Sequence, residues 1–186
     1  MILEAFHAEN PLRAGISREE LRSRAGNAQE RVFAQLLAGL EAEGVVRSEK
    51  DQVRLAAHTI RLSPEQQRVV SGLEAEFLRA GAAPPSPEEA LGRLGVKGNE
   101  RHELFQLLVA ERRLVRAKES LYFHAEALGT IQDKLISYLQ LKKEIGPGDM
   151  KDLLGITRKY AIPLMEYFDS QRITVRQGER RVLRGA

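Results

Sequence analysis

The sequence predicts a mainly α-helical protein with small β-hairpins, and three observations support this fold class. Apolar residues recur at helical spacing in several stretches, pairs of short strand-like segments follow them, and the whole order repeats three times along the 186 residues. Each repeat has a helix, a short extended link, a small helix, a longer helix and two strands around a polar turn. This is the order of the winged-helix fold, so we expect a tandem array of three winged-helix domains of the helix-turn-helix type.

The repeat divides the chain into three modules: a first module at 1–62, a second module at 63–128 and a third module at 129–186. The first carries 9 Lys/Arg and 9 Asp/Glu, the second 9 and 10, and the third 11 and 7, within a net charge of +3 for the chain. All of the excess positive charge therefore lies in the third module. We expect this module to bind nucleic acid and the first two to serve mainly as a spacer.

In the first module, capping patterns place the two helices that precede the hairpin. Ser17 with Glu20 opens a small helix that ends near Gly26, and Asn27 with Glu30 opens the long helix. The long helix has an apolar stripe that should face the core, made of Phe33, Leu36, Leu37 and Leu40. The hairpin strands are expected at 45–47 and 53–55.

The second module follows the same plan. Ser63, Pro64 and Gln66 read as the start of a helix that runs to about Ala80. The segment 82–85 ends in Pro84 and Pro85 and is expected to be extended, because residues before proline avoid the helical region. The remaining elements are a small helix from Ser86 to about Gly95, a long helix at 99–111, and strands at 114–115 and 121–123.

The third module is expected to contain a helix at 129–142, an extended link at 144–147 and a small helix at 149–154. Its long helix has Ala161, Leu164, Met165 and Phe168 at i, i+3, i+4 and i+7, so these four side chains should form the core face. Pro163 lies inside this segment, where proline removes a backbone hydrogen bond. Either the helix is kinked there or it starts later than the pattern indicates.

The start of this long helix is a candidate phosphate site. Thr157 is the expected N-cap, which leaves Arg158, Lys159 and Tyr160 in the first turn, next to free backbone N–H groups. Carboxylates are the usual residues there, so two cations in a row oppose the helix dipole and favour an external anion over a solvated surface turn. Tyr160 is a candidate for stacking on an extruded base.

A basic hairpin follows the helix, with strands expected at 173–176 and 181–184 and a turn at 177–180. Arginine pairs bidentately with phosphate and stacks on bases, so an arginine-rich ribbon indicates nucleic-acid binding. Glu179 at the tip should repel phosphate, which weakens the case for the tip itself. The candidate RNA-binding arginines of this segment are Arg172, Arg176, Arg180, Arg181 and Arg184.

Composition argues against several classes of function. The chain has no cysteine, which fits a reducing, cytoplasmic setting, and its four histidines lack metal-ligand spacing. We find no phosphate-binding P-loop or nucleophile elbow and no apolar run that would span a membrane. We therefore expect no catalytic residues, no metal, no cofactor, no membrane association and a monomer.

Two segments resemble a known family. The stretch LLGITRKYAIPLMEYFDSQRITVRQGERRVLR is similar to the last winged-helix domain of the bacterial selenocysteine-specific elongation factors, the SelB family. The stretch FHAENPLRAGISREELR is similar to the second winged-helix domain of that family. The resemblance covers most of the chain and is weak only at 63–128.

The resemblance implies a fragment with the last three of four winged-helix domains, whose GTPase and tRNA-binding body would lie before it. It implies binding of the selenocysteine insertion (SECIS) hairpin in messenger RNA, which tethers GTP and selenocysteinyl-tRNA to the ribosome at a UGA codon. GTP would then be a cofactor only of the GTPase part of the factor that precedes this fragment. The family's RNA contacts come from its final domain, so the expected contacts here are the third-module residues named above.

Two other classes remain open from the residues alone. A DNA-binding regulator would use the same fold, but the outward face of the last long helix offers Lys159, Pro163, Glu166 and Ser170, which read base edges poorly. A protein-interaction module is the other alternative, and the near-neutral first and second modules fit it best.

Overall fold

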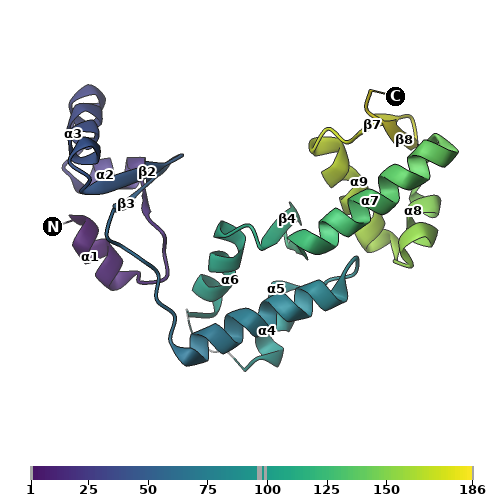
Figure 1. The fold of residues 1–186 in the computed structure, drawn as a ribbon, viewed down its shortest axis with the longest axis horizontal. Coiled ribbons are helices and arrows are strands. Elements are labelled where there is room, and N and C mark those ends of the chain that lie inside the picture. Colours follow the sequence, from purple (N-terminus) through teal and green to yellow (C-terminus); the bar gives the residue numbers. More distant parts are fainter. Residues whose placement is uncertain (1, 96–97, 99, 186) are drawn as a thin grey trace. The chain divides into compact units, whose positions relative to one another are not determined.

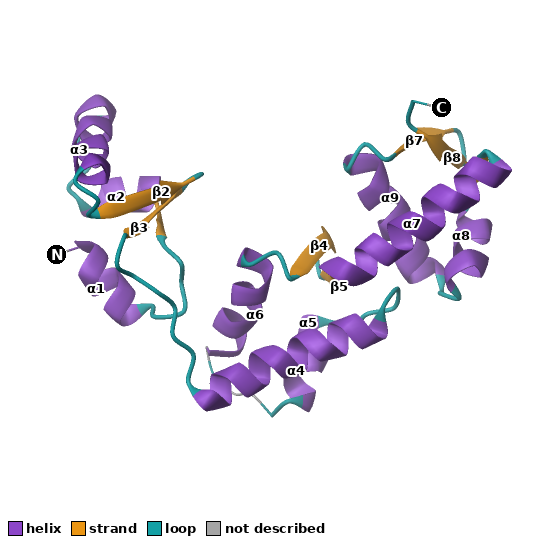
Figure 2. Ribbon diagram, in the orientation of Figure 1, coloured by secondary structure: helices purple, strands orange, loops and turns teal. Residues whose placement is uncertain are grey.

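The computed structural model describes residues 2–95, 98 and 100–185 (Figure 1). These residues form two compact units, Met1–Gln67 and Arg68–Ala186, which we call unit 1 and unit 2. Helices alternate with small antiparallel sheets in both, which confirms the predicted fold class (Figure 2). The boundaries proposed at 62/63 and 128/129 stay predictions.

Unit 1 packs three helices against a three-stranded antiparallel sheet with strand order β1-β3-β2. The helices are α1 (Ile2–Glu9), α2 (Arg18–Arg24) and α3 (Glu30–Ala42). The strands are β1 (Ile16–Ser17), β2 (Val46–Glu49) and β3 (Gln52–Leu55). Ser17 caps α2 as predicted, because its hydroxyl accepts the Glu20 N–H at 3.1 Å.

The long helix of unit 1 departs from the sequence prediction in two ways. Asn27 is not its N-cap, since Gln29 takes that position and Asn27 adopts a φ of 54°, with its N–H bonded to the Arg22 carbonyl at the end of α2. The expected apolar stripe also does not face the core as a whole. Phe33 and Leu37 are buried, but Leu36 is 61% exposed and Leu40 39% exposed.

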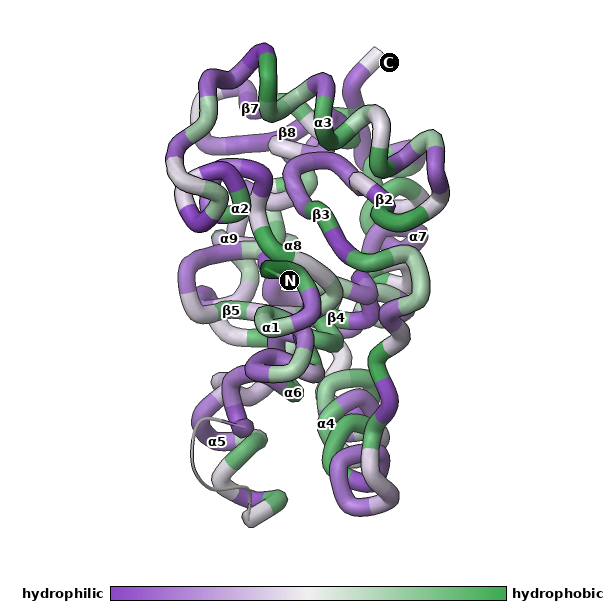
Figure 3. Tube along the Cα trace, turned by 90° about the vertical axis from the view of Figure 1, so that its left-hand side faces the viewer, coloured by the Kyte–Doolittle hydropathy of each residue, from purple (hydrophilic) through white to green (hydrophobic). Residues whose placement is uncertain are grey.

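Two capping boxes open helices of the second module, one just before unit 2 and one in its first half, and the sequence predicted the box at Ser63. Ser63 and Gln66 exchange hydrogen bonds at the start of α4 (Pro64–Ala80), as do Ser86 and Glu89 at the start of α5 (Pro87–Arg93). Residues 82–85 form a loop that pairs with no strand. The remaining elements are α6 (Glu100–Ala110), β4 (Leu114–Lys118) and β5 (Leu121–His124). Figure 3 shows hydrophobic and hydrophilic residues interspersed along α4, as in an amphipathic helix.

The second half of unit 2 has the element order expected for the third module, with sheet order β6-β8-β7. Its helices are α7 (Ala125–Lys142), α8 (Pro147–Leu154) and α9 (Arg158–Ser170). Its strands are β6 (Glu144–Ile145), β7 (Thr174–Gln177) and β8 (Arg180–Leu183). Pro163 lies inside α9, which begins at Arg158, so the alternative of a later helix start is wrong.

The helix α7 starts four residues earlier than predicted. His124, the last residue of β5, is its N-cap, and the His124 Nδ1 atom accepts the Glu126 N–H at 3.2 Å. Residues 125–128, which the sequence analysis left between the last strand of the second module and the first helix of the third, are therefore the first turn of this helix.

A hydrophobic core in unit 2 includes residues on both sides of the proposed boundary at 128/129. Phe123 of β5 is buried together with Leu135 of α7, Ile145 of β6 and Phe168 of α9, and Val115 of β4 packs against the same cluster. All four side chains of the predicted α9 stripe are buried there, as expected from their spacing: Ala161, Leu164, Met165 and Phe168.

Candidate nucleic-acid interface

The N-terminal end of α9 presents the first group of candidate residues. Thr157 is the N-cap, with extended backbone, but its side chain makes no capping hydrogen bond. Arg158 and Lys159 are exposed and Tyr160 is half-buried. The first turn holds no acidic residue, so its free N–H groups and the positive end of the helix dipole favour an anion.

Lys159 and Tyr160 lie beside the first half of unit 2. Tyr160 lines a cleft with Pro84, Pro85 and Glu89, and the Lys159 ammonium lies 5.2 Å from the centre of the Tyr160 ring. Hydrogen bonds from Ser86 lower the pKa of Glu89, and the charge of Lys159 adds to this shift. An RNA that reached this end of α9 would therefore also meet the segment at 84–89.

Arg181 is turned into the protein. It is only 6% exposed, and its Nε atom donates to the Asp169 carboxylate at 3.1 Å. The same carboxylate accepts the Thr174 hydroxyl at 2.6 Å. These bonds join the end of α9 to both strands of the hairpin, so the structure gives Arg181 a packing role and leaves its predicted RNA contact untested.

Two further arginines of the hairpin are paired on the surface. The Arg180 guanidinium lies 3.1 Å from Glu144 and 3.5 Å from Asp149, next to the start of α8. Arg176 donates to the Gly178 carbonyl at 2.8 Å and lies 3.8 Å from Glu179. Because both arginines are at least half exposed, these ion pairs are weak and can exchange for a phosphate.

Three candidate arginines are exposed and have no ion-pair or hydrogen-bond partner for their side chains within the described ranges: Arg158, Arg172 and Arg184. The Arg184 N–H bonds the Ile173 carbonyl at 3.0 Å, so Arg172 and Arg184 sit together at the base of the hairpin. Arg158 is at the opposite end of α9, roughly 18 Å away for a helix of this length. The candidate residues thus form two groups and not one cluster.

Sequence reasoning missed cations outside these two groups. Lys142 and Lys143 end α7 and are exposed. Lys118 of β4 lies 3.1 Å from Glu166 on the outward side of α9. The adjacent lysines at 142 and 143 were a visible signal, whereas the pairing of Lys118 with α9 depends on packing that no local pattern encodes.

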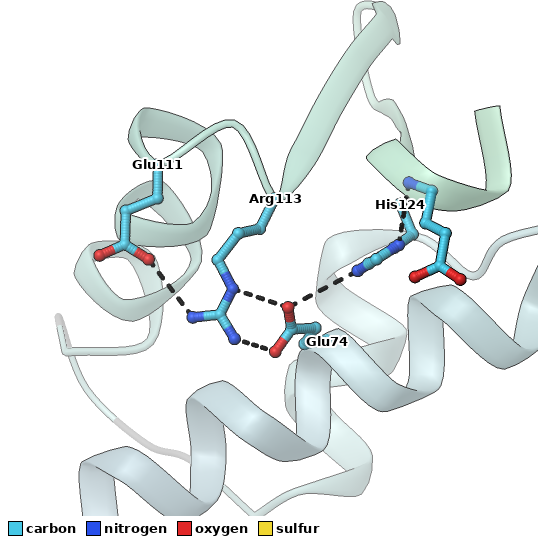
Figure 4. Close-up of polar contacts among 5 residues, drawn as sticks. Glu74, Glu111, Arg113 and His124 are labelled. Carbon is cyan, nitrogen blue, oxygen red and sulfur yellow. Dashed lines mark hydrogen bonds and ion pairs between the residues drawn. The ribbon is translucent and has the colours of Figure 1, made fainter. Parts of the chain in front are cut away.

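A polar cluster joins three elements inside unit 2 (Figure 4). Glu74 of α4 accepts two hydrogen bonds from Arg113, which also lies 3.3 Å from Glu111, and Glu74 is 3.6 Å from His124 Nε2. Burial lowers the pKa of His124; Glu126 opposes this shift and Arg113 adds to it. We assign the cluster a structural role, since it ties α4 to the starts of β4 and α7.

The described residues support neither a metal site nor a membrane-spanning helix. In that part of the chain, no group of three or more His, Cys, Asp or Glu side chains is placed to hold a metal ion. Over the same residues, the longest helices are too polar or too short for a bilayer crossing.

Comparisons with known proteins identify related families. Two family models described as "Elongation factor SelB, winged helix" match residues 1–55 and 137–183, together more than half of the chain. A selenocysteine-specific elongation factor of Desulfomicrobium baculatum is 33% identical over 183 residues, and that of Escherichia coli K12 is 24% identical over 198 residues. The matches cover 98% and 99% of this chain but only 29% and 30% of those relatives.

Two solved structures have a similar fold. The mRNA-binding domain of E. coli SelB, solved in complex with SECIS RNA, matches 66% of this chain and 99% of its own, with a TM-score of 0.57 and 23% identity. A bacterial selenocysteine-specific elongation factor, EF-Sec, matches 91% of this chain and 26% of its own, with a TM-score of 0.52 and 23% identity. These likenesses confirm that the array consists of winged-helix domains.

Proposed function

Since the chain belongs to the SelB family of elongation factors, we propose that it binds a SECIS-type hairpin in messenger RNA through its third module. The observation that carries this proposal is where the free positive charge lies. Residues 129–186 hold the chain's excess cations, and Arg158, Arg172 and Arg184 remain exposed and unpaired after the described acidic residues of the module are accounted for. Such cations bind the phosphate backbone of a folded RNA.

Duplex DNA is a poorer fit than RNA. A winged-helix DNA reader lays its long helix in a major groove, with the outward side chains on base edges. In unit 2 that side of α9 is partly covered, because Glu166 pairs with Lys118, and Pro163 is buried beside the β4–β5 turn. An RNA hairpin can instead be held by its backbone and its unpaired bases at the two ends of α9.

The complete factor would act as a GTPase that carries selenocysteinyl-tRNA to the ribosome at a UGA codon. In this proposal GTP and tRNA bind the part of the factor outside this chain, and the chain supplies the mRNA tether. It would work in the cytoplasm as a monomer, with the ribosome as the further partner of the complete factor.

The proposal is tested by titrating the 186-residue chain with a labelled SECIS hairpin, a scrambled hairpin of equal length and a duplex DNA. We expect the SECIS hairpin to bind at least tenfold more tightly than the other two at about 0.15 M salt, where nonspecific phosphate contacts are largely screened. The Arg158→Ala/Arg172→Ala variant should lose most of this binding.

The matched control is Arg18→Ala/Arg47→Ala, which removes the same charge from unit 1. This variant should bind the hairpin as tightly as the unaltered chain. If the control variant loses binding and the third-module variant does not, then the third module is not the RNA-binding module.

A further inference from the structure

The outward side of α3 in unit 1 is an apolar stripe that no described residue of unit 1 covers. Val32, Leu36 and Leu40 are 46%, 61% and 39% exposed, while Phe33 and Leu37 of the same helix are buried. The three exposed side chains are spaced at i, i+4 and i+8 and border a shallow groove with Gln35, Gly39 and Glu43. The space next to Gly39 is open, because a Cβ built on this residue would have no described atom within 4 Å.

The stripe is unsuited to nucleic acid. Of the groove-lining residues, the charged one is Glu43, a carboxylate that repels phosphate. In α9, by contrast, the exposed N-terminal turn carries Arg158 and Lys159. The corresponding long helices of the two units therefore present different chemistry.

A second copy of this chain is also a poor occupant. Three part-exposed aliphatic side chains offer on the order of a few hundred Å² of apolar surface, whereas a stable dimer buries roughly 800 Å² on each partner. A patch of this size matches the apolar face of a single amphipathic helix, which inserts anchors at i, i+3, i+4 and i+7.

The groove is acidic at one end. Glu43 is the C-cap of α3, where the free carbonyl groups already give the helix a negative end, and the exposed Glu41 lies two residues earlier, outside the groove lining. Arg31 lies near the other end of α3 but does not line the groove. A helix that binds along the groove is therefore favoured when lysine or arginine lies at the end that meets Glu43.

We propose that the outward face of α3 is a docking site for one amphipathic helix of a protein partner, with its apolar side on Val32, Leu36 and Leu40 and a basic end at Glu43. The site is separate from the RNA-binding module and gives the first module a function beyond that of a spacer. The partner is a protein with a basic, amphipathic helix.

The test uses two synthetic 16-residue helical peptides with the same leucine face, one ending in Lys-Lys-Arg and the other in Glu-Glu-Asp. Each is titrated into the ¹⁵N-labelled 186-residue chain. We expect the basic peptide to shift the backbone amides of α3 and to bind at least threefold more tightly than the acidic one. Leu36→Glu should abolish the shifts, and Glu43→Lys should reverse the preference.

Leu141→Glu is the matched control, because Leu141 is a still more exposed leucine on α7 of unit 2. It should leave peptide binding unchanged, and the spectra of all variants report whether unit 1 stays folded. Three results would overturn the proposal: unshifted α3 amides, equal binding of the two peptides, or α3 shifts that appear on concentrating the chain alone, which would indicate a second copy. RNA titration of the same samples tests the third module independently.

Discussion

Arg172 and Arg181 carry the same charged group in very different surroundings. Arg181 is buried and bonded to Asp169, which also accepts the Thr174 hydroxyl, so its loss would leave a carboxylate without its cation. Arg172 is exposed, with a φ of 60° at the end of α9, and its side chain has no partner within the described ranges. Arg181 therefore stabilises the fold, and Arg172 is available to a ligand.

Single substitutions should separate these two roles. Arg172→Ala is expected to reduce the slope of log K against log salt for hairpin binding by about 0.7 to 0.9, the share of one phosphate contact. The unfolding midpoint should hardly change. Arg181→Ala should instead lower the free energy of unfolding of unit 2 by roughly 3–5 kcal/mol, as for a broken buried ion pair.

The measurements are fluorescence-anisotropy titrations at four salt concentrations and urea unfolding followed by tyrosine emission. All four tyrosines lie in unit 2, so their emission reports that unit alone. An unchanged salt slope in Arg172→Ala would show that this side chain does not contact phosphate. An unchanged urea midpoint in Arg181→Ala would show that this side chain does not stabilise unit 2.

Two buried histidines should make the stability of each unit depend on pH. Burial lowers the pKa of His7 in unit 1, helped by His58 and Arg54, and the His7 Nε2 atom must be unprotonated to accept the Leu55 N–H. Burial also lowers the pKa of His124 in unit 2. The unfolded chain then binds more protons than the folded chain, so stability is complete above a pH of about 6.5 and falls as the pH drops below it.

We expect a lower urea midpoint at pH 5.5 than at pH 7.5 for both units. His124→Asn keeps a capping oxygen at the start of α7 but cannot be protonated, so it should lessen the acid loss in unit 2, measured by tyrosine emission. His7→Gln should act in the same way on unit 1 in circular dichroism. If each variant loses as much stability at pH 5.5 as the unaltered chain, the acid loss comes from other groups.

At the scale of elements, the sequence predicted what is local. The capping box of Ser63 and the buried stripe of α9 were confirmed, because each depends on residues three or four positions apart. The α3 stripe was predicted only in part, since apolar spacing shows that a face is hydrophobic but not whether anything covers it. The partners of Arg181 and Arg180 could not be predicted from local patterns, because Asp169 and Glu144 come close to them only in the folded chain.

Two glycines of unit 1 should respond to alanine in opposite ways. A Cβ at Gly15 would lie 2.7 Å from the Val53 carbonyl oxygen of β3, so Gly15→Ala should cost roughly 1–3 kcal/mol of stability through overpacking. Gly39 is inside α3 with open space around it, so Gly39→Ala should add roughly 0.5–1 kcal/mol by restricting the unfolded chain.

Far-UV circular dichroism in a urea gradient measures both changes. The urea midpoint followed by tyrosine emission should be the same in both variants as in the unaltered chain, because no tyrosine lies in unit 1. A neutral Gly15→Ala would mean that the loop before β1 moves away from β3 at little cost.

At the scale of the whole molecule, the second and third modules predicted from the repeat pack together within unit 2. Elements on both sides of the proposed 128/129 boundary share one core, in which Phe123 of β5 packs with α7 and α9. The polar cluster around Glu74 ties α4 to β4 and to the start of α7. The third module is thus expected to depend on the second for its stability, although the RNA contacts proposed above belong to the third module alone.

This dependence predicts how shortened chains behave. A chain of residues 129–186 lacks Phe123, the His124 cap and the first turn of α7, whereas a chain of residues 63–186 keeps all three together with the Ser63 capping box. We expect the shorter chain to be less stable by at least roughly 3–5 kcal/mol, the usual cost of removing a buried phenylalanine. Urea unfolding followed by tyrosine emission measures this difference.

The variant Phe123→Ala in the 63–186 chain is the matched control, because it removes the same side chain without shortening α7. It should account for much of the lost stability, and the hairpin affinity of both altered chains should recover when unfolding is suppressed by an osmolyte such as trimethylamine N-oxide. Equal urea midpoints for the two chain lengths would instead make the third module an independent domain. In that case the joint core around Phe123 would contribute little to the stability of the third module.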